Sequence, residues 1–92
     1  QQFQIDTLFL SLEGIDLRDG LSVVDVLDGH TKTVLVKKAK RVICMADHSK
    51  FNKSFFYKIA PIADVDMVIA DDGLDEATRE LFRQNNIPLV LA

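Results

Sequence analysis

The chain has 92 residues with 48% hydrophobic and 27% charged residues, so it forms at most one domain of ordinary globular composition and is not intrinsically disordered. No apolar run approaches the ~20 residues that span a bilayer and no basic-then-apolar leader opens the sequence, so we expect neither a membrane partner nor secretion. The net charge of -3 is too small to indicate a partner, and the single cysteine, Cys44, excludes an internal disulfide and favours a reducing, cytoplasmic location.

The charges are unevenly distributed along the chain. Residues 1–31 carry six acids and one base, residues 32–58 carry eight bases and one acid, and residues 59–92 carry seven acids and two bases. A basic middle between acidic flanks either attracts an anion or forms the solvated face of a helix. Both interpretations stay open on charge alone.

Four short apolar runs predict buried strands. These runs are Ile5–Leu12, Arg41–Ala46, Met67–Ala70 and Pro88–Ala92. None of them alternates cleanly between apolar and polar residues, which is typical of a parallel sheet that helices cover on both faces.

The connections between these runs predict two helices. The first spans Asp28–Lys40, with Asp25 or Asp28 as its cap and lysines in its last turn. The second spans Asp75–Asn85 and carries a full amphipathic stripe. Between the second and third apolar runs, Ser54–Ile59 is predicted as a short edge strand and Pro61–Asp64 as a turn.

This order of elements predicts an α/β fold with a small, mostly parallel sheet of four or five strands and flanking helices. The sequence opens almost within its first strand, so we expect residues 1–92 to be the later part of a larger α/β domain. We see no internal repeat, linker or low-complexity segment.

Three polar loops are predicted at the carboxyl ends of strands, where open parallel sheets bind ligands. They are Glu13–Asp16, Asp47–Lys50 and Asp71–Gly73. Lys50 would contact a phosphate and Ser49 would donate a hydrogen bond to a ligand. Asp16 and Asp47 would accept hydrogen bonds from sugar hydroxyls.

Gly14 would allow the backbone to approach the ligand closely. Each of these residues also has a purely structural interpretation. Asp47 and Ser49 could cap a turn, Asp72 could help to start the last helix, and Lys50 could be a solvated lysine.

Other candidate sites are weaker. Neither His30 nor His48 lies in a local ligand cluster with metal-site spacing, so we expect no metal, and a buried, inert thiol is the simplest role for Cys44. Nucleotide-binding fingerprints are absent, so we expect no cofactor. The aromatic residues at 51–57 fit core and edge packing better than stacking on nucleic acid. The first predicted helix is followed by a strand, so no helix-turn-helix is formed to read DNA.

The loops carry a resemblance to a known family. Phe9-Leu10-Ser11-Leu12-Glu13-Gly14-Ile15-Asp16, then Ala46-Asp47-His48-Ser49-Lys50-Phe51, and then Ala70-Asp71-Asp72-Gly73-Leu74 follow in an order that resembles the C-terminal effector domain of the DeoR family of bacterial transcription regulators. The resemblance covers nearly the whole chain. Its most specific part is the D-x-S-K-F motif followed by a D-D-G turn.

This resemblance implies a fold similar to ribose-5-phosphate isomerase and the CoA transferases. It implies a non-enzymatic sensor of a phosphorylated sugar or related metabolite, in an oligomeric repressor of a carbohydrate operon. Ligand residues of the family map onto Gly14, Asp16, Asp47 and Lys50. By the same resemblance, the chain lacks the N-terminal winged helix-turn-helix that binds DNA and the first part of the sensor domain, which would supply a phosphate-cradling loop.

Two alternatives remain at this stage. A sugar-phosphate isomerase or CoA-transferase-like enzyme would need a general base, and Glu13 and Asp16 are the only suitably paired acids. Residues 22–29 lack the glycine run and the lysine of the isomerase, which argues against turnover. A purely structural α/β interaction domain is the third interpretation. As a fragment, the chain is expected to bind sugar phosphate weakly or not at all and to dimerise or aggregate through an uncovered sheet edge.

Overall fold

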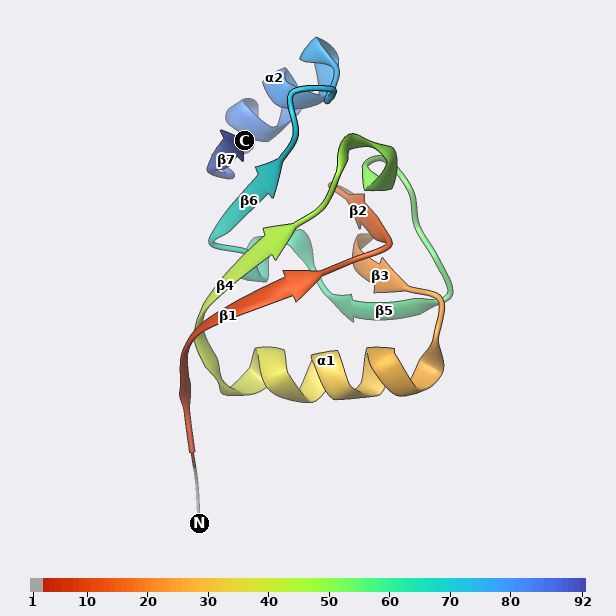
Figure 1. Cartoon of the computed structure of the whole chain (residues 1–92), viewed down its shortest axis with the longest axis vertical. Coiled ribbons are helices and arrows are strands. Elements are labelled where there is room, and N and C mark those ends of the chain that lie inside the picture. Colours follow the sequence, from red (N-terminus) through yellow and green to blue (C-terminus); the bar gives the residue numbers. More distant parts are fainter. Residues whose placement is uncertain (1–2) are drawn as a thin grey trace.

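The computed structural model describes residues 3–92, which form two sheets, two α-helices and two short 3₁₀ turns (Figure 1). The larger sheet has four strands: β1 (Ile5–Ser11), β4 (Ala39–Met45), β6 (Met67–Ala70) and β7 (Leu89–Leu91). Their order is β1-β4-β6-β7, and every neighbouring pair is parallel. The predicted parallel α/β sheet is therefore confirmed, together with all four predicted strands.

A second, antiparallel sheet of three strands was not predicted. It comprises β2 (Gly14–Asp16), β3 (Gly20–Val23) and β5 (Tyr57–Ala60), in the order β2-β3-β5. The predicted size of the parallel sheet, four or five strands, is confirmed, but the three strands of the second sheet raise the total above the number expected. The supposed loop Glu13–Asp16 is mostly strand β2, and the edge strand predicted at Ser54–Ile59 is β5, displaced toward the C-terminus and placed at the edge of the second sheet.

The two α-helices lie close to their predicted positions. Helix α1 (Val26–Lys38) is capped by Asp25, whose Oδ1 accepts a hydrogen bond from the Leu27 amide at 3.0 Å. It ends two residues earlier than predicted because β4 begins directly at Ala39. Helix α2 (Glu76–Gln84) is capped by Asp75. The 3₁₀ turns are η1 (His48–Lys50) and η2 (Ile62–Asp64).

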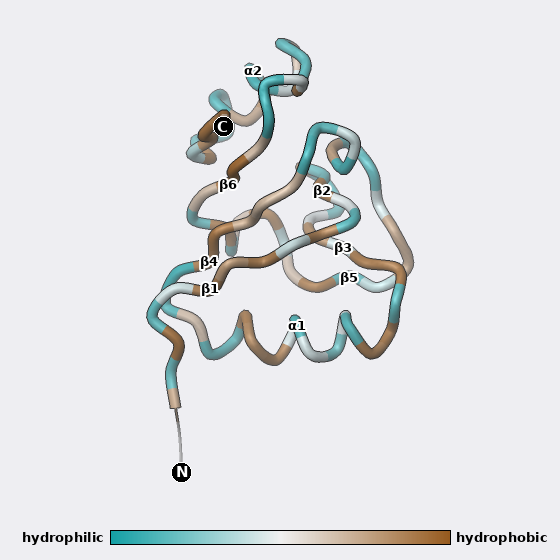
Figure 2. The backbone as a smooth tube through the Cα atoms, viewed as in Figure 1, coloured by the Kyte–Doolittle hydropathy of each residue, from teal (hydrophilic) through white to brown (hydrophobic). Residues whose placement is uncertain are grey.

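The hydrophobic core lies on one face of the parallel sheet. Strand register places five buried side chains on that face: Leu10, Val42, Cys44, Val68 and Ala70. They share one cluster with Leu21 and Val23 of the second sheet and with Phe82 of α2. Apolar segments of β1, β4 and β6 run through the centre of the molecule (Figure 2).

Both helices contribute to this one cluster. Val36 of α1 packs against it in part and Phe82 of α2 is buried in it, and Phe82 meets Phe51 edge-on with ring centroids 5.6 Å apart. The expectation that helices cover both faces of the sheet is therefore not met by residues 3–92. None of the helices in this part of the chain has the length and apolar character needed to cross a membrane.

Candidate functional site

The candidate site is the edge of the parallel sheet where β1, β4 and β6 end. After β1 the chain turns into β2, after β4 it forms η1, and after β6 it forms the turn Asp71–Gly73 that leads to α2. Because the strands are parallel, these three segments lie at the same edge. This is the edge at which the sequence placed its polar loops.

A backbone bridge joins the segments that carry Asp16 and Lys50. Ile15 pairs with Phe51 in a parallel bridge, and the Asn52 amide donates to the Ile15 carbonyl at 2.8 Å. The side chains of Ile15 and Phe51 are both buried. Asp16 and Lys50 are the immediate chain neighbours of these anchored residues, so the fold holds their segments side by side.

Gly14 is required by packing inside the protein. A Cβ added there would lie 2.6 Å from the Lys53 carbonyl oxygen and 2.6 Å from Ser22 Oγ. Ser22 is fully buried, and its Oγ accepts from the Phe55 amide at 2.9 Å. The close approach predicted at Gly14 therefore exists, but it is made to the chain's own segment 53–55.

Asp16 turns its side chain toward its own loop. Its Oδ2 accepts from the Arg18 amide at 3.0 Å and from the Asp19 amide at 2.8 Å, which fixes the turn between β2 and β3. The second carboxylate oxygen makes no hydrogen bond with residues 3–92. Asp16 thus has a structural role that leaves one oxygen for another partner.

Asp47 and Ser49 form the cap of η1. Asp47 Oδ1 accepts from the Ser49 amide at 2.8 Å and from the Ser49 hydroxyl. The hydroxyl bond and the backbone bond hold the pKa of Asp47 below its ordinary value, and the nearby Lys50 ammonium adds to this effect. The capping alternative is therefore present in the structure, and the carboxylate stays ionised well below neutral pH.

Lys50 carries a charge without a bonded partner. Its ammonium makes no ion pair or hydrogen bond with the part of the chain that the structure describes. The residue itself is half-buried, whereas most of the other lysines between residues 32 and 58 are exposed. Lys32, by contrast, is paired with Asp28 at 3.0 Å and donates to the Ser11 carbonyl at 2.6 Å. Lys50 is therefore a cation beside the ionised Asp47 at the candidate site.

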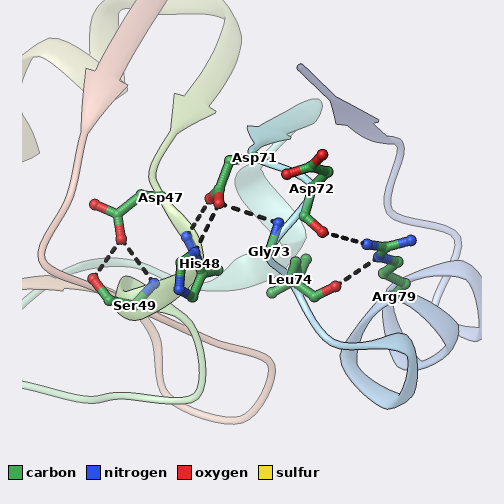
Figure 3. Close-up of polar contacts among 8 residues, drawn as sticks. All are labelled: Asp47, His48, Ser49, Asp71, Asp72, Gly73, Leu74 and Arg79. Carbon is green, nitrogen blue, oxygen red and sulfur yellow. Dashed lines mark hydrogen bonds and ion pairs between the residues drawn. The ribbon is translucent and has the colours of Figure 1, made fainter.

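His48 and Asp71 tie the ends of β4 and β6 together (Figure 3). Asp71 Oδ2 lies 2.7 Å from His48 Nδ1, and Asp71 Oδ1 accepts from the His48 amide at 2.5 Å. A carboxylate only accepts, so Nδ1 carries the hydrogen. This bond raises the pKa of His48 above its ordinary value and lowers the pKa of Asp71.

The turn after β6 is closed by three further hydrogen bonds. Asp71 Oδ2 accepts from the Gly73 amide at 3.2 Å, and a Cβ at Gly73 would come within 2.6 Å of His48 Nδ1. On the other side, Arg79 of α2 donates to the carbonyl oxygens of Asp72 and Leu74 at 2.7 Å each (Figure 3). Arg79 thus fixes the turn to the first part of α2.

Sequence reasoning named both loops but missed the pairing of His48 with Asp71. The signal was available, because the two residues each follow a strand and β4 and β6 are neighbours in the sheet. The sequence argued against a metal site at His48 and favoured a solvated or hydrogen-bonding role, but it did not single out Asp71 as the partner. Arg79 was missed because its partners are carbonyl oxygens, which carry no sequence signal.

The chemistry available at this edge is hydrogen bonding and charge. Asp16 and Asp47 offer carboxylate oxygens, Lys50 offers an ammonium and His48 offers its second ring nitrogen. Among residues 3–92 no three His, Cys, Asp or Glu side chains gather in a way that could hold a metal ion. Cys44 lies in the core, where burial raises the pKa of its thiol to about 12.

Comparison with known proteins agrees with this architecture. Residues 1–72 match the model of the DeoR C-terminal sensor domain. The chain is 32% identical over 91 residues to a protein of Escherichia coli O157:H7 named for repression of the aga operon. It is 29% identical over 89 residues to the transcriptional repressor GlcR and 32% identical over 91 residues to the transcriptional regulator IolR, both of Bacillus subtilis strain 168.

These alignments cover 97–99% of the chain but only 34–36% of each relative. The chain therefore spans about a third of the length of the curated relatives it matches. The family model covers most of the chain, including β1 to β6, η1 and the first part of the turn after β6. On this evidence the chain belongs to the DeoR C-terminal sensor domain family.

Proposed function

We propose that the chain is the effector-sensing part of a DeoR-type transcription regulator and does not itself bind DNA or catalyse a reaction. The relatives are named as transcriptional repressors and regulators, and the family model describes a sensor domain. In a sensor the ligand acts by shifting a population between states that differ in their affinity for the ligand. The DNA-binding module that reads this shift would lie elsewhere in a regulator of the relatives' length.

The proposed effector is a phosphorylated sugar or a related metabolite. The observation that carries this proposal is Lys50, an ammonium that has no bonded partner among the described residues and lies next to carboxylate oxygens at the carboxyl edge of the sheet. The ammonium suits a phosphate, and the oxygens of Asp16 and Asp47 suit sugar hydroxyls. Gly14 and Ser49 complete the edge by holding these segments in place.

A binding role fits this edge better than acid–base catalysis. Asp16 and Asp47 each use a carboxylate oxygen to fix their own turn, and the bonds from Ser49 keep Asp47 ionised. A general base needs freedom to take and release a proton from the substrate. Fixed, ionised carboxylates are better suited to hold hydroxyl groups.

Amide chemical shifts of the chain would test the effector during titration with glucose 6-phosphate, glucose and inorganic phosphate. We expect glucose 6-phosphate to shift the amides of residues 47–51 with a Kd of about 1 mM or weaker, which corresponds to ~4 kcal/mol. Glucose and inorganic phosphate alone should each bind several-fold more weakly.

A matched pair of variants distinguishes a specific effector site from a general attraction of anions by the basic segment. Lys50→Gln should weaken glucose 6-phosphate binding at least threefold, while Lys53→Gln, in an exposed lysine three residues away, should leave it unchanged. Equal losses in both variants would show that the basic segment attracts anions without a site. Shifts confined to residues away from the carboxyl edge would show that the effector site lies elsewhere.

A further inference from the structure

Both buried hydroxyl groups of residues 3–92 hold the segment that follows η1. Ser22 and Thr78 are the only polar side chains buried in this part of the chain. Ser22 Oγ accepts from the Phe55 amide at 2.9 Å, and Thr78 Oγ1 accepts from Asn52 Nδ2 at 2.9 Å. Burying a polar group is costly unless it is hydrogen-bonded, so these two contacts hold the segment from two sides. Ser22 belongs to the second sheet, whereas Thr78 belongs to α2.

Thr78 is tied to the start of α2 by the helix cap. Its hydroxyl donates to Asp75 Oδ1 at 2.8 Å, and its backbone amide donates to Asp75 Oδ2 at 3.1 Å. The hydroxyl uses its one hydrogen on the cap, so toward Asn52 it can only accept. The bonds from Thr78 lower the pKa of Asp75, so the cap stays ionised at neutral pH and this order of donors and acceptors is kept.

Asn52 suits its position through both its backbone and its side chain. Its φ is +61°, in the left-handed region that asparagine enters more readily than most other residues. Its backbone amide donates to the Ile15 carbonyl at 2.8 Å, while its side-chain amide reaches Thr78. Asn52 therefore joins α2 to β2 directly after η1.

An aromatic contact supports the same connection one turn further along α2. Thr78 and Phe82 are four residues apart, so they lie on the same face of the helix. Both are buried, and the ring of Phe82 meets the ring of Phe51 edge-on at 5.6 Å. This face of α2 therefore contacts Phe51 and Asn52, the two residues that directly follow Lys50.

The position of Lys50 depends on its neighbours in the chain, because its ammonium has no bonded partner in the described part of the structure. On the N-terminal side its backbone amide donates to the Asp47 carbonyl at 3.1 Å. On the C-terminal side Phe51 and Asn52 are held by α2. The contacts of α2 thus help to fix the backbone from which the Lys50 side chain extends.

We propose that Thr78 is a positioning residue of the effector site. Through Asn52 it holds residues 47–52 in the arrangement in which Lys50 can meet the phosphate of the effector. This inference rests on the proposed function. It extends the site to α2, which lies outside residues 1–72, the part of the chain that matches the family model.

Two substitutions at Thr78 test this role, with glucose 6-phosphate as the probe and the amide shifts of residues 47–51 as the readout. Thr78→Val keeps the branched shape but removes the hydroxyl, and it should weaken binding at least threefold. Thr78→Ser restores the hydroxyl and should bring the Kd back to within about twofold of that of the unchanged chain. Thr33→Val is the control and should leave the Kd unchanged, although it removes a hydroxyl that donates to the Gly29 carbonyl at 2.8 Å in α1.

Asn52→Gly tests the other end of the contact. Glycine tolerates the left-handed backbone but has no side chain to reach Thr78, so this variant should lose as much affinity as Thr78→Val. Asn52 is exposed, so its variant decides the question even if Thr78→Val does not fold. The double variant should bind no more weakly than either single variant, because all three lack the same hydrogen bond. The proposal is overturned if either single variant binds as tightly as the unchanged chain, if Thr33→Val weakens binding equally, or if the two losses add.

Hydrogen exchange without effector distinguishes this inference from the proposed function. The Asn52 amide should exchange at least threefold faster in Thr78→Val than in the unchanged chain, and Thr78→Ser should restore the slower rate. A chain that binds no glucose 6-phosphate but shows this exchange pattern would overturn the proposed effector and keep Thr78 as the residue that positions the loop. Equal exchange rates in all variants would overturn the role of Thr78 itself.

Discussion

At the scale of single residues, the pair of His48 and Asp71 makes stability depend on pH. The pKa of His48 is raised above its ordinary value of 6.5, so its contribution is complete below that value and is lost as the pH rises through the folded pKa. The pKa of Asp71 is lowered from 3.8, so its contribution is complete above 3.8 and is lost as the pH falls. The pair therefore stabilises the fold most between about pH 4 and pH 6.5.

His48→Gln tests this dependence. The variant should be less stable than the unchanged chain at pH 5.5. The difference between them should be smaller at pH 8.5, because the contribution of His48 is lost as the pH rises through its folded pKa. Urea unfolding at the two pH values measures both quantities. His30→Gln, in an exposed histidine of α1, is the control and should show no such change. A stability difference that is the same at both pH values would mean that the pair acts only as a neutral hydrogen bond.

At the scale of elements, helix α1 depends on its cap. The helix has only 13 residues and a weakly amphipathic sequence, so it gains little from propensity or from a hydrophobic stripe. Asp25→Ala removes the acceptor for the Leu27 amide and should lower the free energy of unfolding by about 1 kcal/mol. Asp25→Asn keeps an acceptor and should recover most of that loss. Urea unfolding of the two variants would show whether the cap or the charge matters.

The hairpin between β2 and β3 depends on Gly20. Its φ of +81° is unfavourable for any residue with a side chain, and an added Cβ would collide with the Ala60 carbonyl oxygen on β5. Gly20→Ala should therefore cost about 2–3 kcal/mol. Asp19→Ala, in the exposed neighbouring turn residue, should stay within about 0.5 kcal/mol of the unchanged chain. If the two variants unfold alike, the second sheet is not part of the cooperative fold.

The same elements show how far the sequence could predict the fold. The parallel strands were predicted because each is a nearly continuous apolar run, and α2 because its apolar stripe recurs at helical spacing. Strands β2 and β3 were missed because they have only three and four residues, and two of those residues are glycines. β3 also pairs with β5, whose residues lie about 35 positions later, so no local pattern records the second sheet.

The sequence was enough to predict which loops form the candidate site. It was not enough to predict which contacts their side chains make. The rule that ligands bind at the carboxyl ends of parallel strands predicted that residues 13–16, 47–50 and 71–73 lie together. The cap formed by Asp47 and Ser49 was one of the interpretations left open, but the sequence could not choose between it and ligand binding. Nor could it show that Asp71 would bond to His48, because the carboxylate had several donors within reach. Gly14 was assigned to the ligand, since nothing in the sequence revealed that segment 53–55 would pack against it.

At the scale of the whole molecule, the two sheets share one core. Cys44 in the middle of the parallel sheet and Ile59 in the antiparallel sheet belong to the same cluster of buried side chains. A single core of this kind makes a small domain unfold as one unit. The thiol of Cys44 is an intrinsic probe of this unit, because burial keeps it from reacting until the sheet opens.

Ile59→Val should therefore accelerate labelling of Cys44, although the two residues lie in different sheets. Removing one buried methylene costs about 1 kcal/mol, which corresponds to a roughly fivefold larger open fraction and a fivefold faster reaction. Val24→Ala, in a side chain that is 55% exposed, should change the rate by less than twofold. If Ile59→Val lowers the urea midpoint while the labelling rate of Cys44 stays the same, the parallel sheet opens independently of the second sheet. The shared cluster would then not act as one cooperative core.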